Sequence, residues 1–222
     1  MLNLIIKDIL IQKKTIIYAL LYTIFMEVSF SSILPSGFGL YVMSPMVITY
    51  LFISLAVQYD DKNKSEIILN SLPVKKSDIV IAKYVSTFVF GIVGIISSII
   101  VGFIGNTTGL LIFIGSISTL DIVLVVMSIC IFSSIFYPVY FKFGVSRMKI
   151  FTVLIFMVLF FVPTSAIDYI NQNTNNSLVQ KYISFINATS GVTLNSLVLI
   201  IALILFLISL MVSIRIYNNK EF

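Results

Sequence analysis

The sequence predicts an all-α membrane protein, with a single transmembrane domain over residues 1–222 and six membrane-spanning helices. Composition is the first reason, because 59% of the residues are hydrophobic and only 10% are charged, whereas a soluble domain carries about 25% charged residues. The second reason is a series of long apolar stretches. The third is the placement of the basic residues, which gather in every second connection between those stretches.

The apolar stretches predict spans at residues 15–34, 39–58, 80–104, 118–141, 150–167 and 193–214. A helix needs about 20 apolar residues to cross about 30 Å of hydrocarbon. Residues 110–141 are too long for one span, so within region 105–120 we expect a short re-entrant or outer-leaflet piece at Leu110–Gly115. A short surface helix is expected between Asp168 and Val192, where apolar residues recur at helical spacing.

The basic residues predict the orientation of the chain, since Lys and Arg mark the cytoplasmic side of a membrane protein. Every Lys and Arg except Lys181 falls in or next to the N-terminus, the connections after spans two and four, or the C-terminal tail, with Lys83 among the first residues of span three. Both termini are therefore predicted to be cytoplasmic. The richness in Ile, Asn and Lys is typical of an AT-rich genome, so we expect the plasma membrane of a bacterium.

The first residues predict an amphipathic helix that lies in the membrane interface ahead of span one. Its apolar side would carry Leu2, Ile5, Ile6, Ile9 and Leu10, and its polar side Asn3, Lys7, Lys13 and Lys14. The alternative is that this segment is simply the cytosolic start of the first span.

Composition also excludes several kinds of active site. Histidine is absent, which removes HExxH zinc sites and the His base of Ser-His or Cys-His catalysis. Cys130 is the only cysteine, so an internal disulfide and a Cys-rich metal site are both excluded. No Walker A pattern occurs. We therefore expect no catalytic residue, no metal and no cofactor in this chain. We also expect no nucleic-acid partner, because the basic residues are juxtamembrane.

The connection between spans two and three carries the most specific pattern. Asn63 followed by Glu66 resembles a capping box, which predicts the start of a short helix. Pro73 predicts the end of that helix at the preceding residue, because a residue before proline is pushed out of the α region. Either another protein docks on this helix, or it packs against the membrane surface or its own bundle. The apolar residues that it would present on a charged surface are Ile68, Leu69 and Leu72.

The segment Asp60–Tyr84 resembles the ABC type-2 permease family. It has an acidic pair, a short Lys/Glu-bearing helix, Ser-Leu-Pro-Val, a basic pair, and then Ile-Val-x-x-Lys-Tyr entering a span. In that family the helix at this position is the coupling helix, which seats on a nucleotide-binding subunit. The resemblance thus implies that ATP and Mg are bound by a partner subunit. It also implies an ATPase-coupling site made of Asn63, Glu66, Ile68, Leu69, Leu72 and Pro73.

Two features inside the spans are candidates for function. Glu27 is an acid deep in span one, where insertion of a carboxylate into the membrane costs about 2.5–3.5 kcal/mol. It would therefore belong to the transport path or a dimer seam. The alternative is a protonated side chain that is hydrogen-bonded to a neighbour. Small residues spaced along span three let helices approach closely, either within the chain or at a subunit interface. These residues are Gly91, Gly94, Ser98 and Gly102.

Together these features predict the permease subunit of an ATP-driven ABC exporter, working with a second permease as a homodimer or heterodimer. The chain is similar to permease subunits of staphylococcal exporters of phenol-soluble modulins, which implies amphipathic peptides or lipid-like compounds as substrates. The alternative is an ATPase-independent membrane protein, such as an immunity protein, a sensor or an ion-coupled carrier. A carrier would be expected to hold more ionisable residues at mid-membrane than Glu27.

Overall fold

The computed structural model describes residues 2–13, 15–30, 39–108, 117–173, 176, 179–180 and 191–220. Over these residues the chain forms helices and turns and no strand, which confirms the all-helical fold class. The elements are α1 (Leu2–Ile11), α2 (Ile16–Phe30), the π-helix η1 (Gly39–Met43), α3 (Ser44–Lys62), α4 (Ser65–Ser71), α5 (Lys76–Thr108), α6 (Thr119–Gln172) and α8 (Gly191–Asn218).

Within the described residues, four helical segments are long and apolar enough to cross a membrane: Leu40–Lys62, Lys76–Thr108, Thr119–Val145 and Asn195–Asn218. They correspond to predicted spans two, three, four and six. Each continues about one helical turn beyond its predicted boundary at the end that carries the lysines. Hydropathy locates the apolar part of a helix, whereas the helix itself continues into polar residues.

The first predicted span is described only in part, as helix α2. Residues Leu2–Ile11 and Ile16–Met26 are long and apolar enough only when taken together, and the two helices are bent by 62°. Taken alone, α2 has 15 residues and a length of about 22 Å, short of about 30 Å of hydrocarbon. The bend lies at the start of the predicted span 15–34, and residues 31–34 lie outside the described part of the structure. Within the described residues, the α1–α2 pair brings the candidate spans to at most five.

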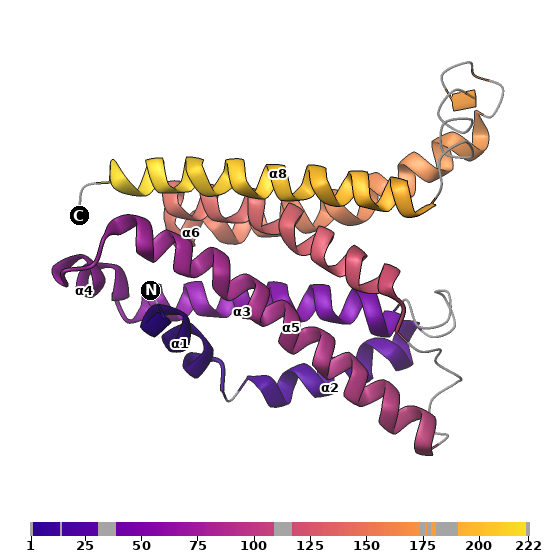
Figure 1. Cartoon of the computed structure of the whole chain (residues 1–222), viewed down its shortest axis with the longest axis horizontal. Helices are drawn as coiled ribbons and strands as arrows, with labels where there is room; N and C mark the ends of the chain where they lie inside the picture. The colour runs from indigo at the N-terminus through magenta and orange to yellow at the C-terminus, as the bar shows by residue number, and fades with distance from the viewer. Residues whose placement is uncertain are drawn as a thin grey trace.

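The fifth predicted span lies in the second half of α6. A straight helix of 54 residues would be about 81 Å long. Figure 1 instead shows both ends of α6 at the side opposite the chain termini, so the chain reverses in between. The reversal is at Gly144, whose φ of 72° and ψ of 179° break the helix within the predicted connection between spans four and five. The expected piece at Leu110–Gly115 lies outside the described residues. So does most of the region where the short surface helix was expected, since 174–175, 177–178 and 181–190 are not described.

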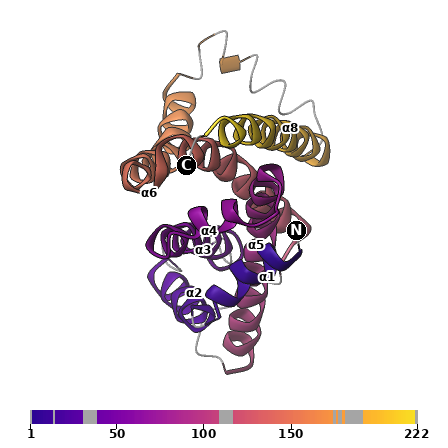
Figure 2. The same ribbon diagram turned by 90° about the vertical axis from the view of Figure 1, so that its left-hand side faces the viewer.

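The core lies where α3, α5, α6 and α8 meet, and aromatic pairs join these helices. Phe52 and Phe90 meet edge to face with ring centroids 5.6 Å apart, and Tyr84 and Phe206 do so at 5.1 Å. Figure 2 shows the start of α5 near α8, with α2 and α3 on the opposite side from α8. Helix α5 thus packs against both α3 and α8.

Candidate functional site

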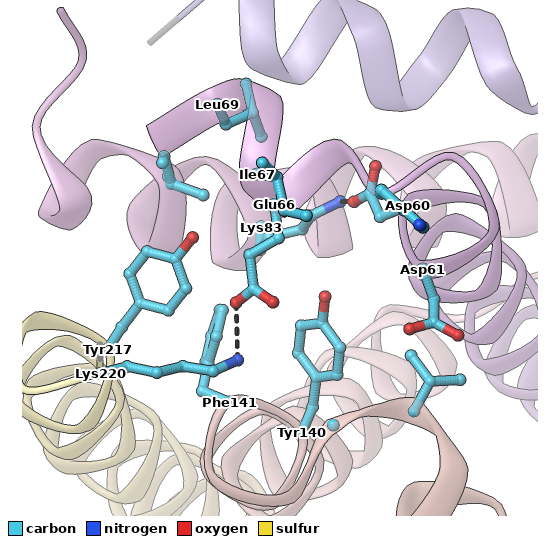
Figure 3. Close-up of a pocket in the computed structure, with 14 residues that line it drawn as sticks. Asp60, Asp61, Glu66, Ile67, Leu69, Lys83, Tyr140, Phe141, Tyr217 and Lys220 are labelled. Atoms are coloured by element: carbon cyan, nitrogen blue, oxygen red, sulfur yellow. Dashed lines mark hydrogen bonds and ion pairs between the residues drawn. The ribbon is translucent and has the colours of Figure 1, made fainter. Parts of the chain in front are cut away.

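The elements predicted to be cytoplasmic gather at one end of the bundle. Figure 1 shows the N-terminus, α4 and the C-terminus together at that end. A pocket of about 240 Å³ lies there, between α4, the start of α5, the Gly144 reversal and the end of α8. Figure 3 shows Tyr140 and Tyr217 projecting into this region from α6 and α8, opposite Glu66 and Lys83.

The start of α4 is not built as the sequence suggested. The Asn63 N–H still donates to the carbonyl of Tyr59 at 3.1 Å, so Asn63 closes α3 instead of opening α4. The residue before α4 is Lys64, which adopts a left-handed conformation at φ 48° and ψ 35° and makes no side-chain capping bond. The predicted capping box of Asn63 and Glu66 is therefore wrong, because α3 extends through the acidic pair and uses Asn63 as its own last turn.

Helix α4 ends before Pro73, as the steric effect of a proline on the preceding residue requires. Leu72 is extended, with φ of −89° and ψ of 155°, and the helix stops at Ser71 before Pro73. The side chains of Ile67 and Ile68 are each 59% exposed, and that of Leu72 is 50% exposed. Leu69, by contrast, is partly buried against the hydrophobic core. The exposed apolar surface of α4 thus consists of Ile67, Ile68 and Leu72, while Leu69 attaches the helix to the bundle.

Polar contacts tie α4 and the start of α5 to the end of α8. The Nζ atom of Lys220 lies 2.8 Å from Oε1 of Glu66, and both side chains are about one-third exposed. The Nζ atom of Lys76 donates to the carbonyl of Lys220 at 2.9 Å and to that of Asn218 at 3.4 Å. Cations are favourable at the C-terminal end of a helix, where the last carbonyls lack intrahelical partners.

A buried group of charges lies beneath this surface. Lys83 on α5 pairs with Asp8 on α1 at 2.9 Å and also with Asp60 on α3, while Lys7 pairs with Asp60 at 2.8 Å. Lys83, Asp8 and Asp60 are all at most 5% exposed. The positive charges of the two lysines equal the negative charges of the two aspartates in number. Buried charges are tolerated when they are paired in this way.

The sequence did not reveal this charge cluster, because its members are far apart in the chain. Lys83 lies inside predicted span three, and a lysine within a span needs a partner. The position of Lys83 within the span was therefore the one feature of the sequence that indicated a buried ion pair. The exposed side chains of α1 include Leu2, Ile6 and Leu10, while Asp8 and Gln12 are buried. Helix α1 thus turns polar groups toward the bundle.

Hydroxyl groups link α5, α6 and α8 deeper in the bundle. The Tyr84 hydroxyl lies 2.7 Å from Ser209 Oγ and 2.8 Å from Ser213 Oγ on α8. The Tyr137 hydroxyl on α6 donates to the carbonyl of Lys83 at 3.0 Å. The adjacent residues Lys83 and Tyr84 therefore join α5 to each of the other long helices.

The remaining candidates lie away from this end. Glu27 is in α2, and its side chain lies outside the described part of the structure. The small residues of α5 pack within the chain: a Cβ on Gly94 would lie 2.9 Å from Cα of Pro45, and one on Gly102 would lie 2.5 Å from the Tyr41 hydroxyl. A Cβ on Gly91 would meet Cδ1 of Ile129 at 2.6 Å, and Ser98 is fully buried.

Long apolar helices, a short exposed helix at one end and a polar cluster beneath it are the features of a polytopic membrane protein. Residues 3–218 match a family model described as "ABC-2 family transporter protein". The match covers nearly the whole chain, so the protein belongs to the ABC-2 transporter family. Membership of that family as a permease implies that an ABC ATPase is its partner. No curated protein and no solved structure matches the chain.

Proposed function

We propose that this chain is the permease subunit of an ATP-driven ABC exporter and that α4 is its coupling helix. The observation that carries the proposal is the exposed apolar surface of Ile67, Ile68 and Leu72 on a short helix at the lysine-rich end. Large apolar groups on a charged surface suit a hydrophobic cleft on a partner protein. The partner would bind ATP and Mg and hydrolyse ATP, while this chain carries no catalytic residue.

In this proposal the end that holds α4 faces the cytoplasm of a bacterium, and both termini lie on that side. The placement of the basic residues supports this orientation. The exposed face of α1, with Leu2, Ile6 and Leu10, then lies in the inner membrane interface, because Asp8 and the nearby Gln12 are turned inward.

A second permease, identical or related, would complete the path. The apolar composition supports an amphipathic peptide or a lipid-like compound as substrate, as the resemblance to phenol-soluble modulin exporters implied. Glu27 keeps its proposed place in the path or the dimer seam.

The test is recovery of the ATPase subunit by tagged permease from detergent extracts. Ile68→Asp places a carboxylate in the proposed dry contact and is expected to release the ATPase. A buried interface anchor contributes about 2 kcal/mol or more, so binding should fall at least about 30-fold. Ile68→Met keeps an apolar side chain at the same position and should retain the ATPase.

Two outcomes would contradict the proposal. Full recovery of the ATPase by Ile68→Asp, at matched expression and with normal transport, would show that α4 is not the coupling element. A wild-type permease that retains no ATPase under any mild detergent would instead favour the ATPase-independent alternative.

A further inference from the structure

Helix α4 and the start of α5 contact the end of a helix that is remote in the chain. Covalently, α4 is joined only to α3 and α5, through Asn63–Lys64 and through residues 72–75. Its links to the end of α8 include the Glu66–Lys220 ion pair, beside which Lys76 at the start of α5 makes two bonds to carbonyls of the α8 terminus.

The length and the start of α4 make such support important. It has seven residues and no side-chain cap at its start, and a helix this short is marginal by itself. It also lies over the pocket of about 240 Å³, so most of its inner side is not packed against other helices. Leu69 is the side chain of α4 that packs against the core.

The end of α8, in contrast, is firmly held. The helix buries one narrow stripe and exposes apolar side chains elsewhere along its length. Tyr217 lies at the end of that stripe, 1% exposed, with its ring 5.2 Å from that of Phe141. Nearer the middle, Ser209 and Ser213 bond to Tyr84. The stripe comprises Ala202, Phe206, Ser209, Ser213 and Tyr217.

We propose that Lys220 is a positioning residue for α4. It fixes the orientation in which α4 presents Ile67, Ile68 and Leu72, and it joins movements of α4 to α8. The inference rests on the proposed function only where it takes that surface to be the ATPase contact. Lys76 supports it by holding the α8 terminus at the start of α5.

An exposed ion pair adds little to the stability of a fold. It can nevertheless decide between orientations of a short helix, because these differ little in free energy when few core contacts distinguish them. Loss of the pair should therefore leave the bundle folded and release α4 alone.

The test is a distance measurement between spin labels on the permease alone, without the ATPase. Labels at Ser71→Cys on α4 and Met211→Cys on α8 occupy exposed positions, and Cys130→Ser removes the native thiol. The otherwise unchanged chain should give one narrow distance distribution. Lys220→Glu should abolish that narrow peak and give a broad distribution.

Three further variants separate positioning from general damage. Glu66→Lys alone should broaden the distribution as Lys220→Glu does, and the reversed pair Glu66→Lys with Lys220→Glu should restore the narrow peak. Arg215→Glu changes the charge of the exposed α8 end without touching the pair and should leave the peak narrow. A narrow peak in Lys220→Glu, or failure of the reversed pair to restore it, overturns the proposal.

This readout also separates the two proposals. The spin labels report the orientation of α4 whether or not an ATPase binds there. A broadened distribution in Lys220→Glu together with unchanged ATPase recovery by Ile68→Asp would sustain the positioning role and reject α4 as the coupling surface.

Discussion

The Nζ atom of Lys83 lies 2.9 Å from Oδ1 of Asp8, although the two residues are 75 positions apart in the sequence. The contact joins the first helix of the chain to α5, and Asp60 extends it to α3. All three groups are buried at the end of the bundle where α4 lies. The N-terminal helix is thus held by the bundle through charge, and its position is coupled to the segment that carries the candidate site.

Removing one member of this cluster should destabilise the protein strongly. Asp8→Ala leaves Lys83 buried with one carboxylate fewer, and breaking a buried pair typically costs about 3–5 kcal/mol. Thermal unfolding can be followed with a thiol-reactive fluorophore, because Cys130 is the only cysteine and is 1% exposed. Asp61→Ala, an exposed neighbour of the cluster, should unfold like the wild type. Equal unfolding temperatures for Asp8→Ala and Asp61→Ala would contradict this account.

The two glycines of α5 nearest α3 should respond differently to alanine. A Cβ on Gly94 meets the backbone of Pro45, which cannot give way unless the helices separate, so Gly94→Ala should cost about 1–3 kcal/mol. A Cβ on Gly91 is too close to the tip of the Ile129 side chain, which can rotate, and meets Thr49 Oγ1 at an ordinary contact distance of 3.8 Å. Alanine also favours the helix by about 0.5–1 kcal/mol, so Gly91→Ala should be near neutral. The same fluorophore assay measures both, and a larger loss at Gly91 than at Gly94 would refute the packing argument.

The hydroxyl of Tyr84 should contribute to the attachment of α8. Tyr84→Phe removes the bonds to Ser209 and Ser213 and keeps the ring packing. Hydrogen bonds between membrane helices are worth about 0.6 kcal/mol on average and up to about 1.7 kcal/mol, so the loss should be modest but measurable. Tyr59→Phe changes an exposed tyrosine and provides the control. Identical unfolding of the two variants would mean that the network contributes nothing to stability.

Thiol labelling in intact cells should report the orientation. In a Cys130→Ser background, a cysteine at Thr108 lies at the end of α5 opposite α4, and a cysteine at Lys64 lies beside α4. An impermeant reagent is expected to label Thr108→Cys and to leave Lys64→Cys unmodified until the cells are opened. The reverse pattern would place both termini outside.

The sequence predicted four of the spans to within about one helical turn, because hydropathy and charge are local properties. Pro73 likewise predicted the end of α4, since its steric effect acts on its neighbour. The start of α4 was mispredicted, because Asn63 and Glu66 fit a capping pattern only if α3 has already ended. Whether α3 ends there depends on packing that one segment does not encode.

The buried charges of Asp8, Lys83 and Asp60 could not be predicted from the sequence for a related reason. Each residue by itself reads as a polar group near a membrane boundary, and only the folded bundle brings them within bonding distance. The amphipathic pattern of the first residues had the same limitation. Its period was visible, but the choice of which side meets the bundle follows from Lys83, which lies far along the chain.

Gly144 reverses α6 in open surroundings, since a Cβ there would meet nothing within 4 Å. Its φ of 72° and ψ of 179° are the mirror image of an extended conformation near φ of about −72°, which any L residue adopts freely. The chirality of a residue at position 144, and not the size of its side chain, therefore decides whether it fits this conformation. An L-alanine would be strained by about 1–3 kcal/mol, whereas a D-alanine introduced by chemical ligation would fit without strain and, by restricting the unfolded chain, would hold the reversal more firmly than glycine does.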